Sequence, residues 1–207
     1  MSAATAAVLT AGAARGDARR IGVLFMIGSA CFAVASVPGA SNLVPELVGV
    51  TYFVGSLFFT TAGFEQLRTA RGDRRETSAA VIQFAGTLAF NVSTFLGMLD
   101  GLDAKLENLL VWSPDAVGSA CFLVASAIAT LVARADSRVA RRSALLNLIG
   151  SVAFAASAIA AYTVPDTDQF LNASLDNSMT LIGALFFFRA ARLFVVPSSR
   201  FRERPAG

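Results

Sequence analysis

Two nearly identical stretches contain the residues most able to do chemistry in this chain. "IGSACF" begins at Ile27 and "VGSACF" begins at Val117, so each stretch places a serine and a cysteine in an apolar run. A serine nucleophile needs a neighbouring general base, which is usually histidine. The chain has 207 residues and no histidine, and its one lysine, Lys105, lies outside the apolar runs. We therefore expect no serine-based catalysis at these motifs.

The two cysteines give equally little support for metal or redox chemistry. Cys31 and Cys121 both lie in apolar surroundings, where thiols usually pack as inert side chains. Without histidine, the usual ligand for zinc, copper and haem iron is missing. We predict no catalytic residues, no metal ligands and no cofactor, and we expect a protein without enzyme activity.

The composition indicates a membrane protein. Hydrophobic residues make up 55% of the chain and charged residues 15%, whereas soluble domains carry about 25% charged residues. The mean hydropathy is +0.63. About 20 apolar residues cross a bilayer, and backbone groups in lipid must be paired within a helix. We predict an all-α fold, a polytopic integral membrane bundle of six transmembrane helices. The expected spans are 20–37, 46–66, 78–99, 115–134, 144–163 and 177–196.

Charge predicts the orientation of these spans. Every basic residue except Lys105 falls in the N-terminal region, after the second or fourth span, or near the C-terminus. Basic loops stay in the cytoplasm, so both termini are predicted to be cytoplasmic. We expect 1–18 to be a disordered tail and 198–207 a basic tail. These arginines account for the pI of 9.4 as topology signals, and they are expected to contact anionic lipid headgroups, so no nucleic-acid partner is expected.

The connections on the other side are acidic, and the spans themselves carry few polar groups. The acidic residues assigned to these connections are Glu46, Asp100, Asp103, Glu107, Asp115, Asp166, Asp168 and Asp176. No aspartate pair is expected at spanning depth. Glu65 is expected to pair with Arg68 at the end of the second span. Asn91 lies deepest among the polar residues and is the candidate for a polar cavity.

One of the acidic connections has the pattern of a short helix. Leucines recur on one helical face within "DGLDAKLENLLVW", and the charged residues point elsewhere. We expect a short helix lying in the membrane interface and ending at Trp112.

A repeat connects all six spans. Each span contains a glycine, then a small residue, then a phenylalanine four residues after the glycine. The glycines follow one another at intervals of 27 to 33 residues. The six pairs are Gly28 and Phe32, Gly55 and Phe59, Gly86 and Phe90, Gly118 and Phe122, Gly150 and Phe154, and Gly183 and Phe187.

The repeat is interpreted as a helix-packing motif. Residues four apart share a helix face, so each ring is expected to lie over the notch left by its own glycine. Small residues allow close helix approach in lipid, where apolar burial does not drive association. The notches could meet helices of the same chain or of a second copy, which leaves a homo-oligomer open. The repeating unit could be a helix pair or a set of three helices.

The helix pairs resemble a known family. The stretch "LFMIGSACFAVASVPGASNLVPELVGVTYFVGSLFFTTAGFEQLR" is similar to the YrhK-like domain, a small two-helix membrane unit of bacterial proteins. The last pair, from "LLNLIGSVAFAAS" to "LIGALFFFRAARLFVVP", is similar again. The resemblance implies a membrane-embedded unit in the cell membrane of a prokaryote, without an established activity and without catalytic residues.

These observations favour a noncatalytic membrane module, either a structural protein or one that responds to lipids or partners. The alternative is a transporter or channel for a small neutral or apolar solute, because internal repeats are common in transporters.

Overall fold

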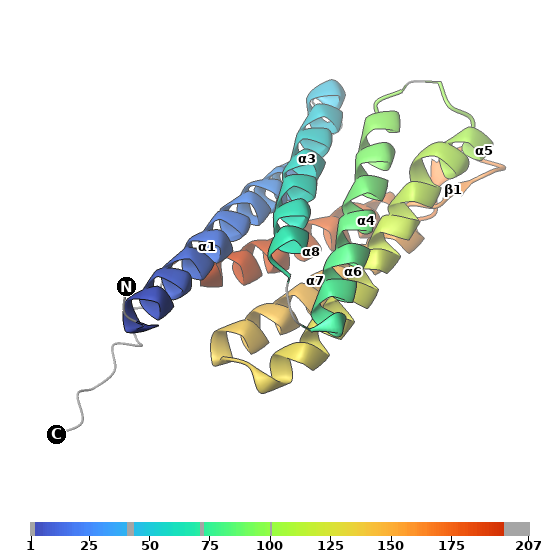
Figure 1. Cartoon of the computed structure of the whole chain (residues 1–207). Coiled ribbons are helices and arrows are strands. Elements are labelled where there is room, and N and C mark those ends of the chain that lie inside the picture. Colours follow the sequence, from blue (N-terminus) through green and yellow to red (C-terminus); the bar gives the residue numbers. More distant parts are fainter. Residues whose placement is uncertain (1–2, 41–43, 71–72, 100, 197–207) are drawn as a thin grey trace.

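The structure, a computed structural model, describes the backbone of residues 3–40, 44–70, 73–99 and 101–196, and side chains from residue 14 onward within these ranges. Six long helices dominate it (Figure 1). Each is long and apolar enough to cross a membrane, which confirms the predicted all-α membrane bundle. The long helices are α1 (Ala3–Ala35), α3 (Pro45–Thr69), α4 (Arg74–Leu96), α6 (Ser113–Val132), α7 (Arg138–Ala160) and α8 (Ala173–Val195).

Smaller elements connect the long helices. Before α6 come α5 (Ala104–Glu107) and the π-helix η1 (Asn108–Trp112), and after it comes the 3-10 turn η2 (Ala133–Ala135). Strands β1 (Thr163–Val164) and β2 (Gln169–Phe170) form an antiparallel hairpin between α7 and α8, with Thr163 opposite Phe170.

Local sequence accounts for several helix starts. Pro45 occupies the first turn of α3, where its missing N–H costs nothing. The side chains of Asp73, Ser137 and Asn172 accept hydrogen bonds from backbone N–H groups in the first turns of α4, α7 and α8. These caps satisfy N–H groups that have no partner within the helix.

Two predictions about the segments outside the spans differ from the structure. Residues 1–18 were expected to be disordered, but α1 begins at Ala3, because alanine has the highest helix propensity. The helix expected to end at Trp112 instead continues through η1 into α6, so that Ala104–Ala135 forms one helical stretch. The predicted tail at 198–207 lies outside the described residues.

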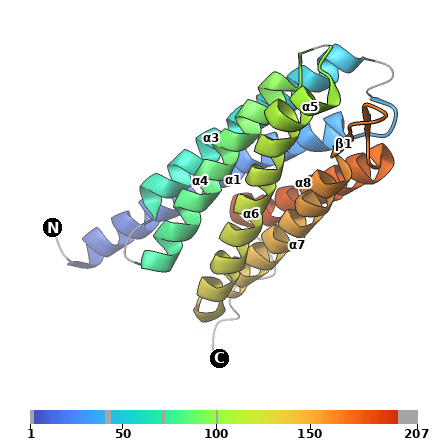
Figure 2. The same ribbon diagram turned by 90° about the vertical axis from the view of Figure 1, so that its right-hand side faces the viewer.

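The helices form a closed ring. In order around it, α1, α3, α4, α6, α7 and α8 each pack against the next, and α8 packs against α1 (Figures 1 and 2). Consecutive helices run in opposite directions. The start of α1, the end of α8 and the turn after α6 lie at one end, the arginine-rich end, where Arg20, Arg68 and Arg138 are found. The other end, with α5 and the β-hairpin, is the acidic end.

The centre of the ring is filled by phenylalanine. All six phenylalanines of the repeat are at most 5% exposed and form one cluster. Phe32, Phe90 and Phe154 form one triangle, with ring centroids 5.8 to 6.4 Å apart. The phenylalanines of the other three helices form a second triangle, with centroids 5.7 to 6.2 Å apart. The core is therefore two stacked aromatic layers across the bundle axis.

Candidate functional site along the bundle axis

The glycines of the repeat face one another in three helix pairs. A Cβ added to Gly28 would lie 2.9 Å from the carbonyl oxygen of Gly55, and one added to Gly55 would lie 3.1 Å from that of Gly28. The same reciprocal contact joins Gly86 to Gly118 across α4 and α6. Gly150 and Gly183 make it across α7 and α8. The backbones therefore cross at points where any side chain would collide.

The rings lie over different glycines from the ones predicted. Among the atoms nearest to a Cβ added at Gly28 are those of Phe59, which belongs to the partner helix, and Phe32 lies near Gly55 in return. The sequence expectation placed each ring over its own glycine. It considered one helix alone, whereas the antiparallel crossing brings the partner's ring into the notch. The contacts lie within one chain, so packing against a second copy is not needed to fill the notches.

The helical register brings a third position of the repeat toward the axis. A residue three before the glycine lies seven before the phenylalanine, which is two turns along the same face. On α1, α4 and α7 this residue is Phe25, Gln83 and Asn147, and all three line a cavity at the arginine-rich end. On α3, α6 and α8 it is Tyr52, Asp115 and Thr180. Because these helices run the opposite way, the second set lies on the acidic side of the aromatic layers.

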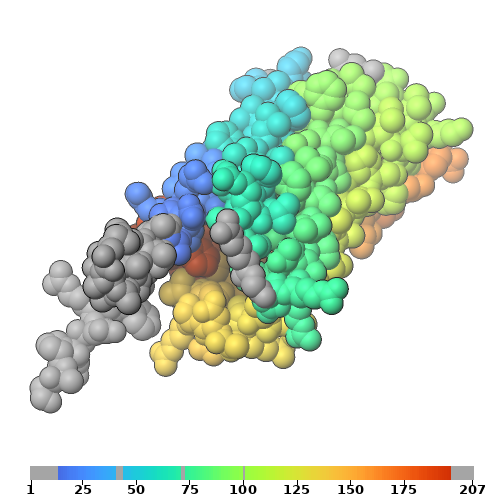
Figure 3. Space-filling view, viewed as in Figure 1, coloured from blue at the N-terminus to red at the C-terminus, as the bar shows by residue number. Residues whose placement is uncertain are grey.

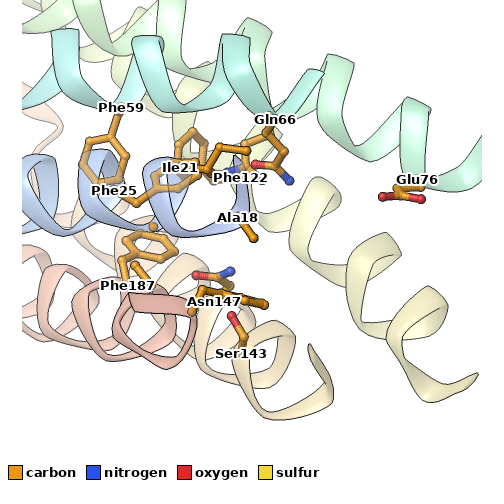
Figure 4. Close-up of a pocket in the computed structure, with 14 residues that line it drawn as sticks. Ala18, Ile21, Phe25, Phe59, Gln66, Glu76, Phe122, Ser143, Asn147 and Phe187 are labelled. Atoms are coloured by element: carbon orange, nitrogen blue, oxygen red, sulfur yellow. The ribbon is translucent and has the colours of Figure 1, made fainter. Parts of the chain in front are cut away.

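The cavity at the arginine-rich end has a volume of about 280 Å³. It ends on the layer formed by Phe59, Phe122 and Phe187. Gln66 from α3 and Asn147 from α7 point toward the cavity from opposite sides, and Glu76 lies farther out (Figure 4). Figure 3 shows the surface hollowed in this region, between α1 and the turn that joins α6 to α7. The cavity thus combines an aromatic floor with neutral amides in its walls.

An ion pair closes one side of this end. Arg20 on α1 lies 2.5 Å from Glu65 on α3, and Arg68 lies 3.5 Å from the same carboxylate. The predicted pairing of Glu65 with Arg68 is therefore confirmed, and Arg20 extends it between two helices. Sequence spacing could not reveal Arg20, which is 45 residues away.

On the acidic side, hydroxyl groups and two carboxylates lie near the axis. The Tyr52 hydroxyl lies 2.8 Å from the Ser36 hydroxyl, and its ring lies edge-on to Phe32 at 5.2 Å. Tyr52, Asp115 and Asp176 belong to α3, α6 and α8, which are not neighbours in the ring.

Asp115 lies close to the middle of its helical stretch. The glycines lie near the middle of their helices, and Asp115 is three residues from Gly118, or about 4.5 Å along the helix. Asp176 is about 10 Å from Gly183 by the same measure. Asp115 belongs to the helical stretch Ala104–Ala135 and Asp176 to α8, and both are long and apolar enough to cross a membrane. The expectation that no aspartate pair lies at spanning depth stays a prediction.

The two carboxylates differ in their partners. Asp176 accepts a hydrogen bond of 2.5 Å from the Ser157 hydroxyl, which also lies 2.5 Å from the Thr180 hydroxyl. Asp115 forms no hydrogen bond or ion pair with the described part of the chain. Its position at the same register as Tyr52 was visible in the sequence, but only after the glycines had been aligned.

Asn91, the polar candidate from the sequence, does not line the cavity at the arginine-rich end. Its Oδ1 atom is buried and has no hydrogen-bond partner among the described residues. Cys31 and Cys121 are free thiols whose Cβ atoms lie against Gly55 and Gly86. Within the ranges that the structure describes, no three histidine, cysteine, aspartate or glutamate side chains are grouped as metal ligands.

Comparisons with known proteins returned no family model, no curated protein and no solved structure that matches this chain. The class of protein is therefore defined by the structure itself: a multi-pass membrane protein with six apolar helices.

Proposed function

We propose that this protein is a noncatalytic membrane protein that carries or conducts a small solute along the axis of its helix ring. The observation that supports this proposal is the arrangement along the axis, where polar side chains occupy the same register position on both sides of the phenylalanine layers. Polar and ionisable residues inside membrane spans often mark a substrate or ion pathway.

The phenylalanine layers would form the closed gate of this pathway. Hydrophobic constrictions block passage because water and hydrated solutes leave them. The two triangles are joined by close ring contacts, with centroids 5.4 Å apart between Phe32 and Phe59 and 5.1 Å between Phe90 and Phe122. The cavity of about 280 Å³ next to the gate is near the lower limit for ligand pockets, roughly 300 Å³, and suits a small solute.

Removing part of the gate tests the proposal. The Phe90→Ala/Phe122→Ala double variant removes one ring from each layer while leaving the glycine crossing in place. We expect glycerol to enter proteoliposomes of this variant at least ten times faster than those of the wild type. Phe95→Ala is the matched control, because Phe95 lies on the same helix as Phe90 but is 52% exposed on the outer face.

The outcome separates the pathway from simple packing. Both variants are first shown to be monodisperse and helical after purification. If the double variant is folded and its liposomes remain as tight to glycerol as those of Phe95→Ala, the gate does not exist and the proposal fails.

The second candidate is a structural module that responds to lipids or partners. It is favoured by the arginines at one end, which suit anionic headgroups, and by the close packing of the core. Native mass spectrometry of protein extracted from its own membrane tests it. Retained anionic lipid, together with a double variant that passes no solute, would favour this candidate over transport.

We also propose that each glycine-paired helix hairpin corresponds to one two-helix unit of the YrhK-like kind, in the cell membrane of a prokaryote. Support comes from the pairing of α1 with α3, α4 with α6, and α7 with α8 through their glycines. The arginine-rich end would face the cytoplasm, as the charge of the connections predicts.

A further inference from the structure

We propose that the cavity at the arginine-rich end binds a small neutral molecule that carries a carboxamide or a similar group on an apolar body. This inference rests on the proposed function for the role of the site. It adds the chemical class of the solute and the side chains that bind it.

The argument begins with three amide side chains in the wall of the cavity. Gln66, Gln83 and Asn147 come from α3, α4 and α7, and all three line the cavity. Amides inside a membrane bundle ordinarily hydrogen-bond from one helix to another. Each of these three is half-buried, and in the part of the chain that the structure describes their side chains form no hydrogen bond. Their donors and acceptors are therefore available to a ligand.

An amide group is a good complement to this wall. Each side-chain amide has a carbonyl oxygen that accepts and an NH₂ group that donates, and a ligand carboxamide offers the same two kinds of group. Gln66 and Asn147 point toward the cavity from opposite sides, so a ligand between them has an amide on either hand (Figure 4). By contrast, the hydroxyl of Ser143 already donates to the carbonyl oxygen of Ala190 at 3.3 Å.

The floor of the cavity determines the other half of the ligand. Phe59, Phe122 and Phe187 close the cavity with rings that are at most 5% exposed, and Phe25 adds a ring from α1. Aromatic rings pack well against an apolar or aromatic body. The volume of about 280 Å³ is that of about nine water molecules at roughly 30 Å³ each, so the body must be compact.

Charge favours a neutral ligand over an ion of either sign. Among the described residues that line the cavity, only Glu76 is charged, and it is exposed and lies farther out than the amides (Figure 4). An anion would meet this carboxylate, and a cation would enter from the end that carries Arg20, Arg68 and Arg138. Farther in, the walls offer only neutral groups, and an ion buried without a counter-charge is costly.

Competition binding with three molecules of the same shape tests the class of ligand. Benzamide is neutral, and near neutral pH benzoate is its anionic counterpart and benzamidinium its cationic one. Purified wild-type protein in detergent is incubated with tritiated benzamide, and protein-free detergent gives the background. We expect saturable binding that unlabelled benzamide displaces, whereas benzoate and benzamidinium should need concentrations at least about ten times higher.

Removal of single amides tests the binding residues. Asn147→Leu should weaken benzamide binding at least about tenfold, because the ligand loses a hydrogen-bond partner in a site with little water. Asn91→Leu is the matched control, because it makes the same exchange in a long helix at a residue that does not line the cavity. It should leave binding within about twofold. Gln83→Leu repeats the test on another helix and replaces Asn147→Leu if that variant is not monodisperse and helical.

The outcomes separate this inference from the proposed function. If the wild type binds no benzamide, if either ion competes as well as benzamide, or if Asn147→Leu and Gln83→Leu bind as the wild type does, the inference is overturned, and the glycerol test of the gate stands apart. If benzamide binds with the expected selectivity while the gate-opened variant stays tight to glycerol, the pathway fails and the ligand site stands.

Discussion

The sharpest structural prediction concerns Gly183, where a single methyl group should disturb the core. A Cβ added there would overlap the ring of Phe154 and lie 2.9 Å from the carbonyl oxygen of Gly150. The ring cannot move aside, because Phe187, Phe32 and Phe90 surround it with centroids 5.1 to 5.9 Å away. The carbonyl belongs to a helix backbone and cannot move alone.

The expected loss in the free energy of unfolding follows from these contacts. Overpacking a core costs typically 1 to 3 kcal/mol, and because neither neighbour can yield we expect about 3 kcal/mol for Gly183→Ala. For a chain of this size, each kcal/mol lowers the unfolding temperature by about 2 to 4 °C, so the loss should be about 6 to 12 °C. Gly63→Ala is the control, because its added Cβ would meet its nearest atom, on Thr87, at an ordinary 3.5 Å.

The assay is thermal denaturation in one detergent, followed by loss of the monodisperse peak after heating. Gly63→Ala should stay within about 0.5 kcal/mol of the wild type, the usual range for a substitution that meets no special feature. The double variant Gly183→Ala/Phe154→Ala should lose at least about 1 kcal/mol less than the sum of its single variants, because the two residues are in contact. Equal stability of Gly183→Ala and Gly63→Ala, or strict additivity in the double variant, would refute the interlocked core.

Three further predictions concern the ends of the bundle. Asn108→Ala removes two hydrogen bonds to the backbone of Thr163, of 2.7 and 3.0 Å, and should cost about 1 to 3 kcal/mol, with faster amide exchange confined to the β-hairpin. Trp112→Phe loses the indole N–H bond to a carbonyl of α7 and should cost about 0.5 to 1.5 kcal/mol in the same thermal assay. In a cysteine-free background, an impermeant thiol reagent should label Thr167→Cys from outside and spare Ser137→Cys, and the reverse pattern would contradict cytoplasmic termini.

The sequence was sufficient to predict the six-helix bundle, because the physical constraints on membrane spans are severe. Length, apolarity and the need to pair every backbone group predict helices near Gly55 or Gly150 without any knowledge of packing. Boundaries were less predictable. Asp115 appeared to start the fourth span, because a carboxylate is normally a sign of an interface, and the helical stretch in fact begins at Ala104.

Sequence spacing could not predict which residues of different helices contact each other inside the helix bundle. Helix periodicity tells which residues share a face, so Phe32 and Gly28 could be assigned to one face. It does not tell which helix that face meets. The placing of Phe59 against Gly28 and of Phe32 against Gly55 depends on the crossing of separate helices. The β-hairpin was missed because its strands have only two residues each, too few for an alternating pattern.

Of the two repeat phases left open by the sequence, the glycine contacts show the helix pair. Three glycine-paired hairpins follow one another around the axis, which is the helix-pair repeat. Within a hairpin, each glycine meets the other's carbonyl and each ring lies over the other's glycine, so its two helices are related by an approximate twofold axis.

This near symmetry also indicates where function lies. Positions that hold the fold are occupied by the same residue types in all six helices, glycine at the crossing and phenylalanine in the layers. The position three residues before each glycine lies two turns from the phenylalanine on the same helix face, yet it holds a different residue in every helix. The six are Phe25, Tyr52, Gln83, Asp115, Asn147 and Thr180. Packing alone would favour one solution repeated six times, as it does for the phenylalanines. The variation at this position indicates a requirement other than packing, and the proposed solute pathway would be such a requirement.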